Sequence, residues 1–175
     1  KIIAITGSCG KTSLKELLVK TLVKFGKVTF SPKSFNNKYG VPLSLFNLNP
    51  NHEYGIFEVG MDKKGEIDQL SKIIKPDIGV ITNISYAHAK NFKNLKQIAL
   101  AKSEIMNNIN EDGSVVLNAD DKFYKFFNKI ALRKKLKVYS FSVKKKNVTI
   151  SLNSVKKKKS KFKVSINIDS KKKYF

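Results

Sequence analysis

The first residues of the chain are an apolar run, then a glycine-rich turn, then a helical pattern. Lys1–Thr6 is short and almost continuously apolar, which is typical of a strand buried on both faces of a parallel sheet. Thr12–Phe25 carries apolar residues at spacings of three and four, which predicts an amphipathic helix. The chain is therefore predicted to open with a strand, a turn and a helix.

The same alternation continues along the chain. Polar turns separate short apolar runs from segments of helical periodicity, and Pro42 stands where a first helical turn tolerates proline. The further predicted strands are Val28–Phe30, Tyr54–Val59, Ile78–Ile84 and Ser114–Leu117, and the further predicted helices are Leu43–Leu48, Ile67–Ile74 and Leu95–Ile109. Such alternation predicts an α/β fold with a mostly parallel, doubly wound sheet and helices on both faces.

The pattern changes at about Lys137. From there, apolar and polar residues alternate within short runs that lysine-rich turns separate, which predicts an antiparallel β-meander with one solvated face. We therefore expect residues 1–136 to form the α/β core and residues 137–175 to extend the same domain. The predicted meander strands contain VYSF, VTISL and FKVSINI.

Composition agrees with a globular domain. Hydrophobic residues make up 41% of the 175-residue chain, and no apolar run approaches the length of about 20 residues that a membrane span needs. Cys9 is the only cysteine, which excludes an intramolecular disulfide and fits a reducing, cytoplasmic location. We expect no membrane span.

The formal net charge of +22 changes this picture only slightly. Arg133 is the only arginine among 35 basic residues, so all the others are lysine. Proteins that read phosphate backbones or bases typically use the bidentate fork of arginine. Charge without a recognition motif is therefore a weak indication of nucleic-acid binding, and we expect no specific nucleic-acid partner.

The turn ITGSCGKTS predicts a phosphate-binding loop. In the common loop, G-x-x-x-x-G-K-[ST], the first glycine would fall at Ile5, but the chain has Gly7 instead. Gly7 and Gly10 still permit a tight turn, and the amides of Ser8–Thr12 can turn toward an anion at the positive end of the following helix. We expect phosphate to bind here, with Lys11 as its cationic partner.

Other chemistry-bearing residues follow the ends of predicted strands. Glu58, Asn83 and His88 lie at or just beyond strand ends, as does Thr12 in the glycine turn, so parallel strands would bring them to one crevice. Taken singly, Glu58 could equally pair with a surface lysine, and His88 could be a packing residue. Lys102, Asn36 and Asn37 carry no signal of their own, because lysine is abundant and paired asparagines usually form turns.

Several stretches together resemble one family. TGSCGKTSLKELL, FNNKYGVPLSLFNL, FEVGMDKKGEIDQL, KPDIGVITNISYAHAKNF, ALAKSEI and VVLNADD occur in the order found in the central domain of Mur ligases. The resemblance is dense from Lys1 to about Asp121, and its loop motifs are most similar to those of the members that add D-alanyl-D-alanine. The shortened loop G-x-x-G-K-[ST] is that family's own variant.

The resemblance implies ATP-dependent amide-bond formation in cytoplasmic peptidoglycan precursor synthesis. The expected substrates are ATP, UDP-MurNAc-tripeptide and D-Ala-D-Ala, joined through an acyl phosphate, with Mg²⁺ or Mn²⁺ as the metal. The resemblance also implies flanking UDP-binding and ATP-closing domains that this chain does not include, so we expect little turnover from the chain alone. We further expect the protein to be a monomer.

The resemblance also assigns roles to residues. Lys11, Glu58, His88 and Lys102 would be catalytic. The nucleotide-binding residues would be Gly7, Ser8, Cys9, Gly10, Lys11, Thr12, Ser13, Asn37 and Asn83. Thr12 and Glu58 would hold one metal ion, and His88 and a carbamylated Lys102 would hold a second.

Two alternatives stay open on the sequence. One is a sibling ligase with the same ATP core and another acceptor, similar to cyanophycin synthetase or folylpolyglutamate synthetase. The other is a basic, non-enzymatic module that binds nucleotide or nucleic acid.

Overall fold

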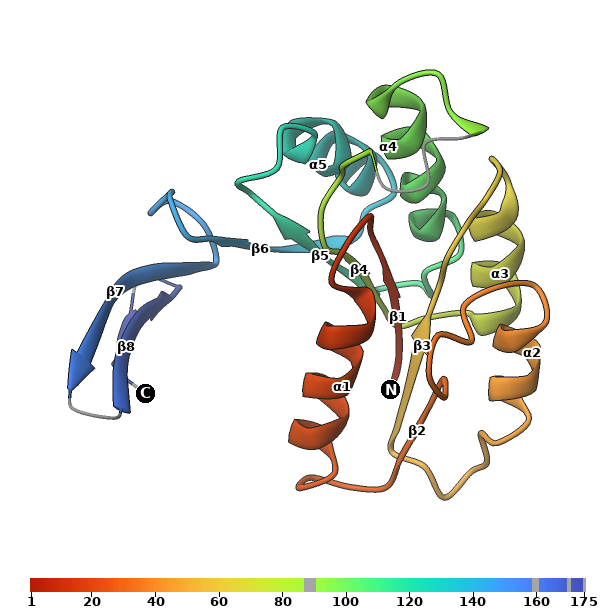
Figure 1. The fold of residues 1–175 in the computed structure, drawn as a ribbon, viewed down its shortest axis with the longest axis horizontal. Helices are drawn as coiled ribbons and strands as arrows, with labels where there is room; N and C mark the ends of the chain where they lie inside the picture. Colours follow the sequence, from red (N-terminus) through yellow and green to blue (C-terminus); the bar gives the residue numbers. More distant parts are fainter. Residues whose placement is uncertain (87–90, 159–160, 170, 175) are drawn as a thin grey trace.

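A computed structural model of the chain describes residues 1–86, 91–158, 161–169 and 171–174. Within these residues, strands and helices alternate as far as β6 (Figure 1). The elements are β1 (Ile2–Thr6), α1 (Lys11–Leu22), β2 (Val28–Phe30), α2 (Gly40–Leu45), β3 (Tyr54–Glu58), α3 (Glu66–Ile74), β4 (Ile78–Ile81), α4 (Leu95–Ser103), the 3-10 helix η2 (Glu104–Asn107), β5 (Ser114–Asn118), α5 (Tyr124–Arg133), β6 (Lys137–Ser142), β7 (Ile150–Lys158), β8 (Lys161–Ile168) and β9 (Lys171–Tyr174).

The described strands form one nine-stranded sheet with the order β2-β3-β1-β4-β5-β6-β7-β8-β9. Neighbouring strands from β2 to β7 are parallel, and the pairs β7–β8 and β8–β9 are antiparallel. After β1, the chain forms β2 and β3 on one side of β1 and then crosses to form β4 on the other side. This reversal opens a crevice at the carboxyl ends of the central strands, where open α/β sheets bind ligands.

Helices cover the two faces of the sheet unequally (Figure 1). On one face, α1 packs through its apolar stripe onto a cluster formed by Ile3, Ile5, Ile56 and Val80. On the other face, α2, α3, α4, η2 and α5 build the larger core around Phe57. The predicted α/β fold with helices on both faces is confirmed, because alternate residues of each central strand enter opposite cores.

The sequence prediction for β6 was wrong in one respect. The strand containing VYSF was predicted to be antiparallel, but it pairs in parallel with both β5 and β7, and the antiparallel meander begins at β7. Helix α5, which the periodicity did not predict, makes the crossover from β5 to β6. Burial alternates along β6, where Tyr139 is exposed and Ser140 is buried, and a strand with one solvated face alternates in either orientation.

Several predicted ends also differ from the structure. The helix predicted over 95–109 stops at Ser103 and tightens into η2, and β4 ends at Ile81 rather than at Ile84. In the described part of the chain, no helix is both long enough and apolar enough to cross a bilayer. The boundary between a 1–136 core and a 137–175 extension stays a prediction.

We expect Phe57→Ala to lower the free energy of unfolding by about 3–5 kcal/mol, because it empties a fully buried position in the larger core. Phe46→Ala is the matched control, since Phe46 is 85% exposed and its loss should cost less than about 0.5 kcal/mol. Denaturant titration of both variants measures the difference, and equal costs would contradict the assigned core.

Candidate functional site

Three central strands end at the same crevice and supply the site. The loop after β1 contains Gly7 and Gly10, β3 ends in Glu58, and the segment after β4 contains Thr82 and Asn83. The pairing registers place Ile5 beside Glu58 on one side and Thr6 beside Ile81 on the other. The crevice is thus a direct consequence of the parallel register.

The loop of residues 7–12, which we call the phosphate loop after its predicted ligand, is held against the segment after β4. The amides of Ser8 and Cys9 donate to the backbone oxygen and Oδ1 of Asn83 at 2.9 and 3.1 Å. The Cys9 carbonyl accepts from Thr82 Oγ1 at 2.7 Å and from Asn83 Nδ2 at 3.2 Å. Asn83 therefore fixes the loop itself, and two of the amides predicted to face an anion, those of Ser8 and Cys9, already have partners.

The remaining amides of the loop are those at the start of α1. The first helical hydrogen bond of α1 runs from the Leu14 amide to the Gly10 carbonyl, so the preceding amides from Gly10 to Ser13 form the helix N-terminus. Such an N-terminus, with its partial positive charge, is suited to bind phosphate. The Lys11 ammonium lies over the loop and donates to the Gly7 carbonyl at 3.0 Å.

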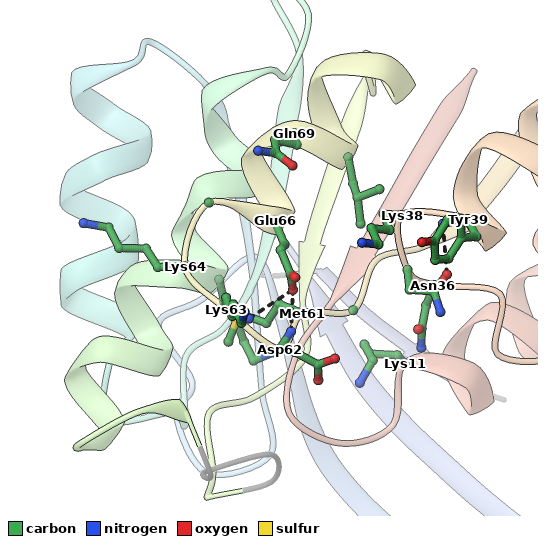
Figure 2. A pocket seen from close by; sticks show the side chains of 15 residues that line it. Lys11, Asn36, Lys38, Tyr39, Met61, Asp62, Lys63, Lys64, Glu66 and Gln69 are labelled. Atoms are coloured by element: carbon green, nitrogen blue, oxygen red, sulfur yellow. Dashed lines mark hydrogen bonds between the residues drawn. The ribbon is translucent and has the colours of Figure 1, made fainter.

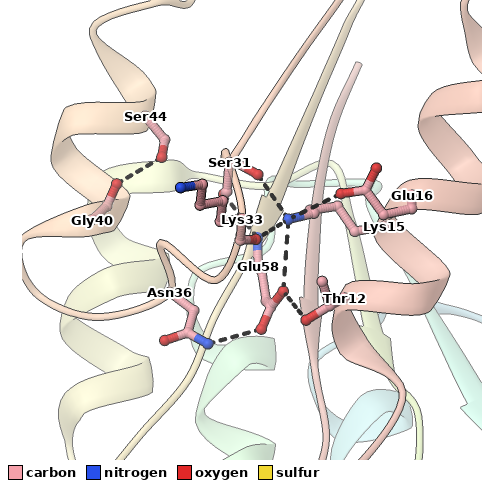
Figure 3. Close-up of polar contacts among 9 residues, drawn as sticks. All are labelled: Thr12, Lys15, Glu16, Ser31, Lys33, Asn36, Gly40, Ser44 and Glu58. Carbon is pink, nitrogen blue, oxygen red and sulfur yellow. Dashed lines mark hydrogen bonds and ion pairs between the residues drawn. The ribbon is translucent and has the colours of Figure 1, made fainter.

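Glu58 is the centre of a second group of contacts (Figure 3). Its side chain is 1% exposed, its Oε2 accepts from Thr12 Oγ1 at 2.8 Å, and its Oε1 accepts from Asn36 Nδ2 at 2.8 Å. Its backbone amide donates to Ser31 Oγ at 3.1 Å. Thr12 and Glu58 are therefore in direct contact, and their predicted role in holding a metal ion stays a prediction.

Lys15 is the nearest cation that contacts this carboxylate. The side chain is fully buried, and its Nζ lies 3.9 Å from Glu58 Oε2. It donates to the carbonyls of Ser31, at 2.8 Å, and of Lys33, and lies 3.5 Å from Glu16 Oε1. A buried carboxylate needs such a partner, because burial removes the hydration of its charge.

A cavity of about 580 Å³ opens between the phosphate loop and the loop after β3 (Figure 2). Lysines are prominent in its lining, and Asp62 and Glu66 supply carboxylates. The Glu66 carboxylate accepts from the amides of Asp62 and Lys63, which shapes the rim after β3. The lining residues are Lys11, Asn36, Asn37, Lys38, Tyr39, Gly60, Met61, Asp62, Lys63, Lys64, Gly65, Glu66, Gln69, Leu70 and Lys102.

Lys102 of α4 reaches this cavity although its side chain is only 3% exposed. Burial, and to a smaller extent the charge of Lys11, lowers the pKa of Lys102 from 10.5 to about 7. A substantial fraction of the amine is therefore neutral near pH 7. A neutral lysine amine is nucleophilic, which is the state that carbamylation requires.

The remaining predicted site residues to be placed are Asn37, Ser13 and His88. Asn37 lines the cavity, but its Oδ1 accepts from the amides of Tyr39 and Gly40, so it caps a turn. Ser13 is exposed at the start of α1. His88 lies outside the described residues. Within the described ranges, no three His, Cys, Asp or Glu side chains gather at a common point.

Sequence reasoning missed the roles of Asn36 and Lys15. Asn36, rather than Asn37, contacts Glu58, and nothing in an Asn-Asn pair says which of the two side chains turns inward. Lys15 had a detectable signal, because it occupies an apolar position in the stripe that continues through Leu18, Val19 and Leu22. A lysine within the buried stripe of a helix indicates a buried partner.

The fold and the loop define a P-loop-containing α/β domain. Comparison with known proteins narrows this class, because residues 5–174 match the Mur ligase middle domain. The chain belongs to the Mur ligase family, and the family resemblance predicted from the sequence is confirmed.

Relatives and solved structures agree on the branch of the family. UDP-N-acetylmuramoyl-tripeptide--D-alanyl-D-alanine ligase of Buchnera aphidicola subsp. Acyrthosiphon pisum is 42% identical over 146 residues, which is 83% of this chain and 32% of the relative. The ligase of the same name from Rickettsia prowazekii is 43% identical over 146 residues, or 81% of this chain and 32% of that protein. The chain thus spans about a third of these relatives.

Two MurF structures have the same fold. MurF from Acinetobacter baumannii superimposes with a TM-score of 0.89 at 30% identity, covering 99% of this chain and 37% of that one. MurF from Thermotoga maritima, solved in complex with ADP, gives a TM-score of 0.84 at 25% identity, covering 99% of this chain and 39% of that one.

We expect Gly7→Ala to destabilise the domain by about 2–4 kcal/mol, through backbone strain and a steric clash. Gly7 has φ +146°, and a Cβ at this position would lie 1.8 Å from Thr82 Oγ1. Gly10→Ala is the control, because Gly10 also has positive φ, at +79°, but open space around it. In thermal denaturation, Gly7→Ala should have a lower Tm than Gly10→Ala. Adding Thr82→Ala to Gly7→Ala should restore part of the lost Tm. Equal losses would contradict the close approach.

The lowered pKa of Lys102 predicts a pH-dependent stability difference from Lys102→Met. Between pH 7 and 10.5 the unfolded chain binds the proton that the folded chain has released, so the wild type gains stability as pH rises. Relative to the variant, this gain should be about 2 kcal/mol between pH 7 and pH 9. Denaturant titrations in carbon dioxide-free buffer measure it, and a difference that does not change with pH would refute it.

Proposed function

We propose that the protein is an ATP-dependent ligase of peptidoglycan precursor synthesis that joins D-Ala-D-Ala to UDP-MurNAc-tripeptide. The observation that carries this proposal is the short phosphate loop beside the Thr12–Glu58 pair, facing a cavity lined by lysines. The names of the relatives support this choice of substrates, and the ADP bound to the Thermotoga maritima protein supports a nucleotide at the loop.

On the nucleotide side, we assign the ATP phosphates to the start of α1. The amides of Gly10–Ser13 and the Lys11 ammonium would surround them, next to Cys9, whose backbone is hydrogen-bonded to Asn83. Because these donors are fixed before the reaction, they can stabilise negative charge on the transferred phosphoryl group without reorganisation. Lys11 is thus the residue whose charge most directly favours the transfer.

Thr12 and Glu58 are suited to hold Mg²⁺ or Mn²⁺. They bring a hydroxyl and a carboxylate oxygen within 2.8 Å of each other next to the phosphate loop, and such hard oxygen donors are the ones these ions prefer. Bound there, the ion would neutralise charge on the nucleotide phosphates. A carbamylated Lys102 and His88 are proposed to hold a second ion, because the amine of Lys102 is partly neutral near pH 7.

On the cavity side, we assign the lysine-lined space to the acceptor carboxylate. A carboxylate oxygen would attack the γ-phosphorus of ATP, forming an acyl phosphate and releasing ADP. The amine of D-Ala-D-Ala would then attack the acyl carbon, forming the amide bond and releasing phosphate and a proton. Lys38, Lys63 and Lys64 would attract the acidic acceptor, and Lys11 lies between the two substrates.

We propose the ligation as an activity of the full-length protein, because this chain covers only about a third of the length of its relatives. We propose that the UDP group and the adenine are bound by parts outside that third, that the protein works in the cytoplasm as a monomer, and that it has no specific nucleic-acid partner. The names of the relatives favour D-Ala-D-Ala over the acceptors of sibling ligases. Phosphate release by the full-length protein, dependent on both UDP-MurNAc-tripeptide and D-Ala-D-Ala, tests the reaction.

We expect Lys11→Ala to weaken Mg²⁺-ADP binding by at least about tenfold, because a charge-assisted contact with phosphate is lost. Lys20→Ala is the matched control, since Lys20 is exposed near the other end of the same helix and should leave affinity unchanged. Isothermal titration calorimetry measures both. Undiminished binding by Lys11→Ala would instead favour the non-enzymatic basic module.

A further inference from the structure

Lys15 is a buried cation that the proposed reaction does not use. It lies one helical turn after Lys11 on α1, and its side chain is fully buried. A buried ammonium is costly unless its donors are satisfied. Besides Glu16 on its own helix, its partners are two backbone carbonyls and the Glu58 carboxylate, which lie across the helix–sheet interface (Figure 3).

Both carbonyl partners of Lys15 belong to the start of one loop. They are those of Ser31 and Lys33, at the beginning of the connection between β2 and α2, which we call the 31–39 loop. Ser31 is also bonded to β3, through its amide to the Ile56 carbonyl and through its hydroxyl from the Glu58 amide. Lys15 adds the contacts that join this start of the loop to α1. Lys15 therefore ties the helix that follows the phosphate loop to the 31–39 loop.

The far part of the 31–39 loop lines the cavity. Asn36 Nδ2 donates to Glu58 Oε1 at 2.8 Å, and the Asn36 carbonyl accepts from the Gly60 amide at 2.7 Å. Asn37, Lys38 and Tyr39 then continue along the cavity wall. Glu58 thus receives Lys15 on one oxygen and Asn36 on the other, so the lysine and the cavity wall meet at one carboxylate.

The phosphate loop is held by different contacts. Its backbone is fixed by Thr82 and Asn83, and Ser8 Oγ exchanges hydrogen bonds with the backbone of Ser85 at 2.9 and 3.0 Å. None of these contacts involves Lys15, although Thr12 at the start of α1 donates to Glu58 Oε2, the oxygen that Lys15 also faces. Loss of the Lys15 ammonium should consequently disturb the cavity wall much more than the phosphate loop.

We infer that Lys15 is a positioning residue that holds the 31–39 loop against Glu58 and thereby sets the cavity wall that receives the acceptor carboxylate. That the cavity receives the acceptor rests on the proposed function. The anchoring of the loop by Lys15 does not depend on it.

Amide hydrogen exchange on this chain tests the anchoring. In Lys15→Met, which keeps most of the side-chain volume but removes the ammonium, the amides of Tyr39, Gly40 and Gly60 should exchange at least about tenfold faster, because local opening of the loop becomes easier. Amides within β1 and β4 should exchange at the wild-type rate. Lys20→Met, at an exposed position of the same helix, should change neither group. Uniform acceleration of all amides, or no acceleration at the loop, would overturn the inference.

A second pair of variants covers the case in which Lys15→Met does not fold, because that variant leaves Glu58 buried without its cation. Glu58→Gln removes the charge and keeps an oxygen acceptor, so Glu58→Gln and Lys15→Met/Glu58→Gln differ only in the lysine contacts. The double variant should still exchange faster at Tyr39, Gly40 and Gly60 than Glu58→Gln alone. Equal rates would overturn the inference.

Steady-state kinetics of the full-length protein test the consequence for the acceptor. For Lys15→Met, the KM for UDP-MurNAc-tripeptide should rise at least about tenfold and the KM for ATP less than about threefold, because uniform binding is lost on one side only. A residue that only stabilises the fold would reduce the active fraction and leave both KM values unchanged, which would overturn this part of the inference. If the wild type does not ligate these substrates, the proposed function fails, and the exchange experiment still decides the anchoring.

Discussion

The structure depends on the burial of one carboxylate at the end of its central strands. Glu58 is 1% exposed, and a charge removed from water in this way must be met by hydrogen bonds and a cation. Thr12 and Asn36 supply the hydrogen bonds and Lys15 the cation, from α1 and from the loop after β2. Satisfying this carboxylate therefore brings together the helix, the sheet and the cavity wall.

The topology of the sheet explains why such a site lies here and not elsewhere. Strand β1 lies between β3 and β4, and all three are parallel, so the phosphate loop, Glu58 and Asn83 extend from the same edge. The larger core places α4 on the face opposite α1, and from there Lys102 reaches the cavity. The two sides of the sheet thus contribute the two buried lysines of the described chain to one region of the molecule.

These two lysines have different chemistry because their surroundings differ. Lys15 contacts the Glu58 carboxylate and the carbonyls of Ser31 and Lys33. Lys102 is buried near the charge of Lys11, and both its burial and that neighbour lower its pKa. In a chain whose basic residues are almost all lysine, the environment rather than the residue type separates the functional lysines from the solvated ones.

The sequence by itself determined the alternation of strands and helices from β1 to β5, the glycine turn between β1 and α1, and the strand-end position of Glu58, because each depends on neighbours close along the chain. Only the tertiary structure decided that β6 runs parallel, that Asn36 rather than Asn37 turns to Glu58, and that Lys15 is its buried partner. Those outcomes depend on contacts between segments distant in sequence. An alternating strand, an asparagine pair and a lysine in a helix each allow more than one such arrangement, and packing selects one of them.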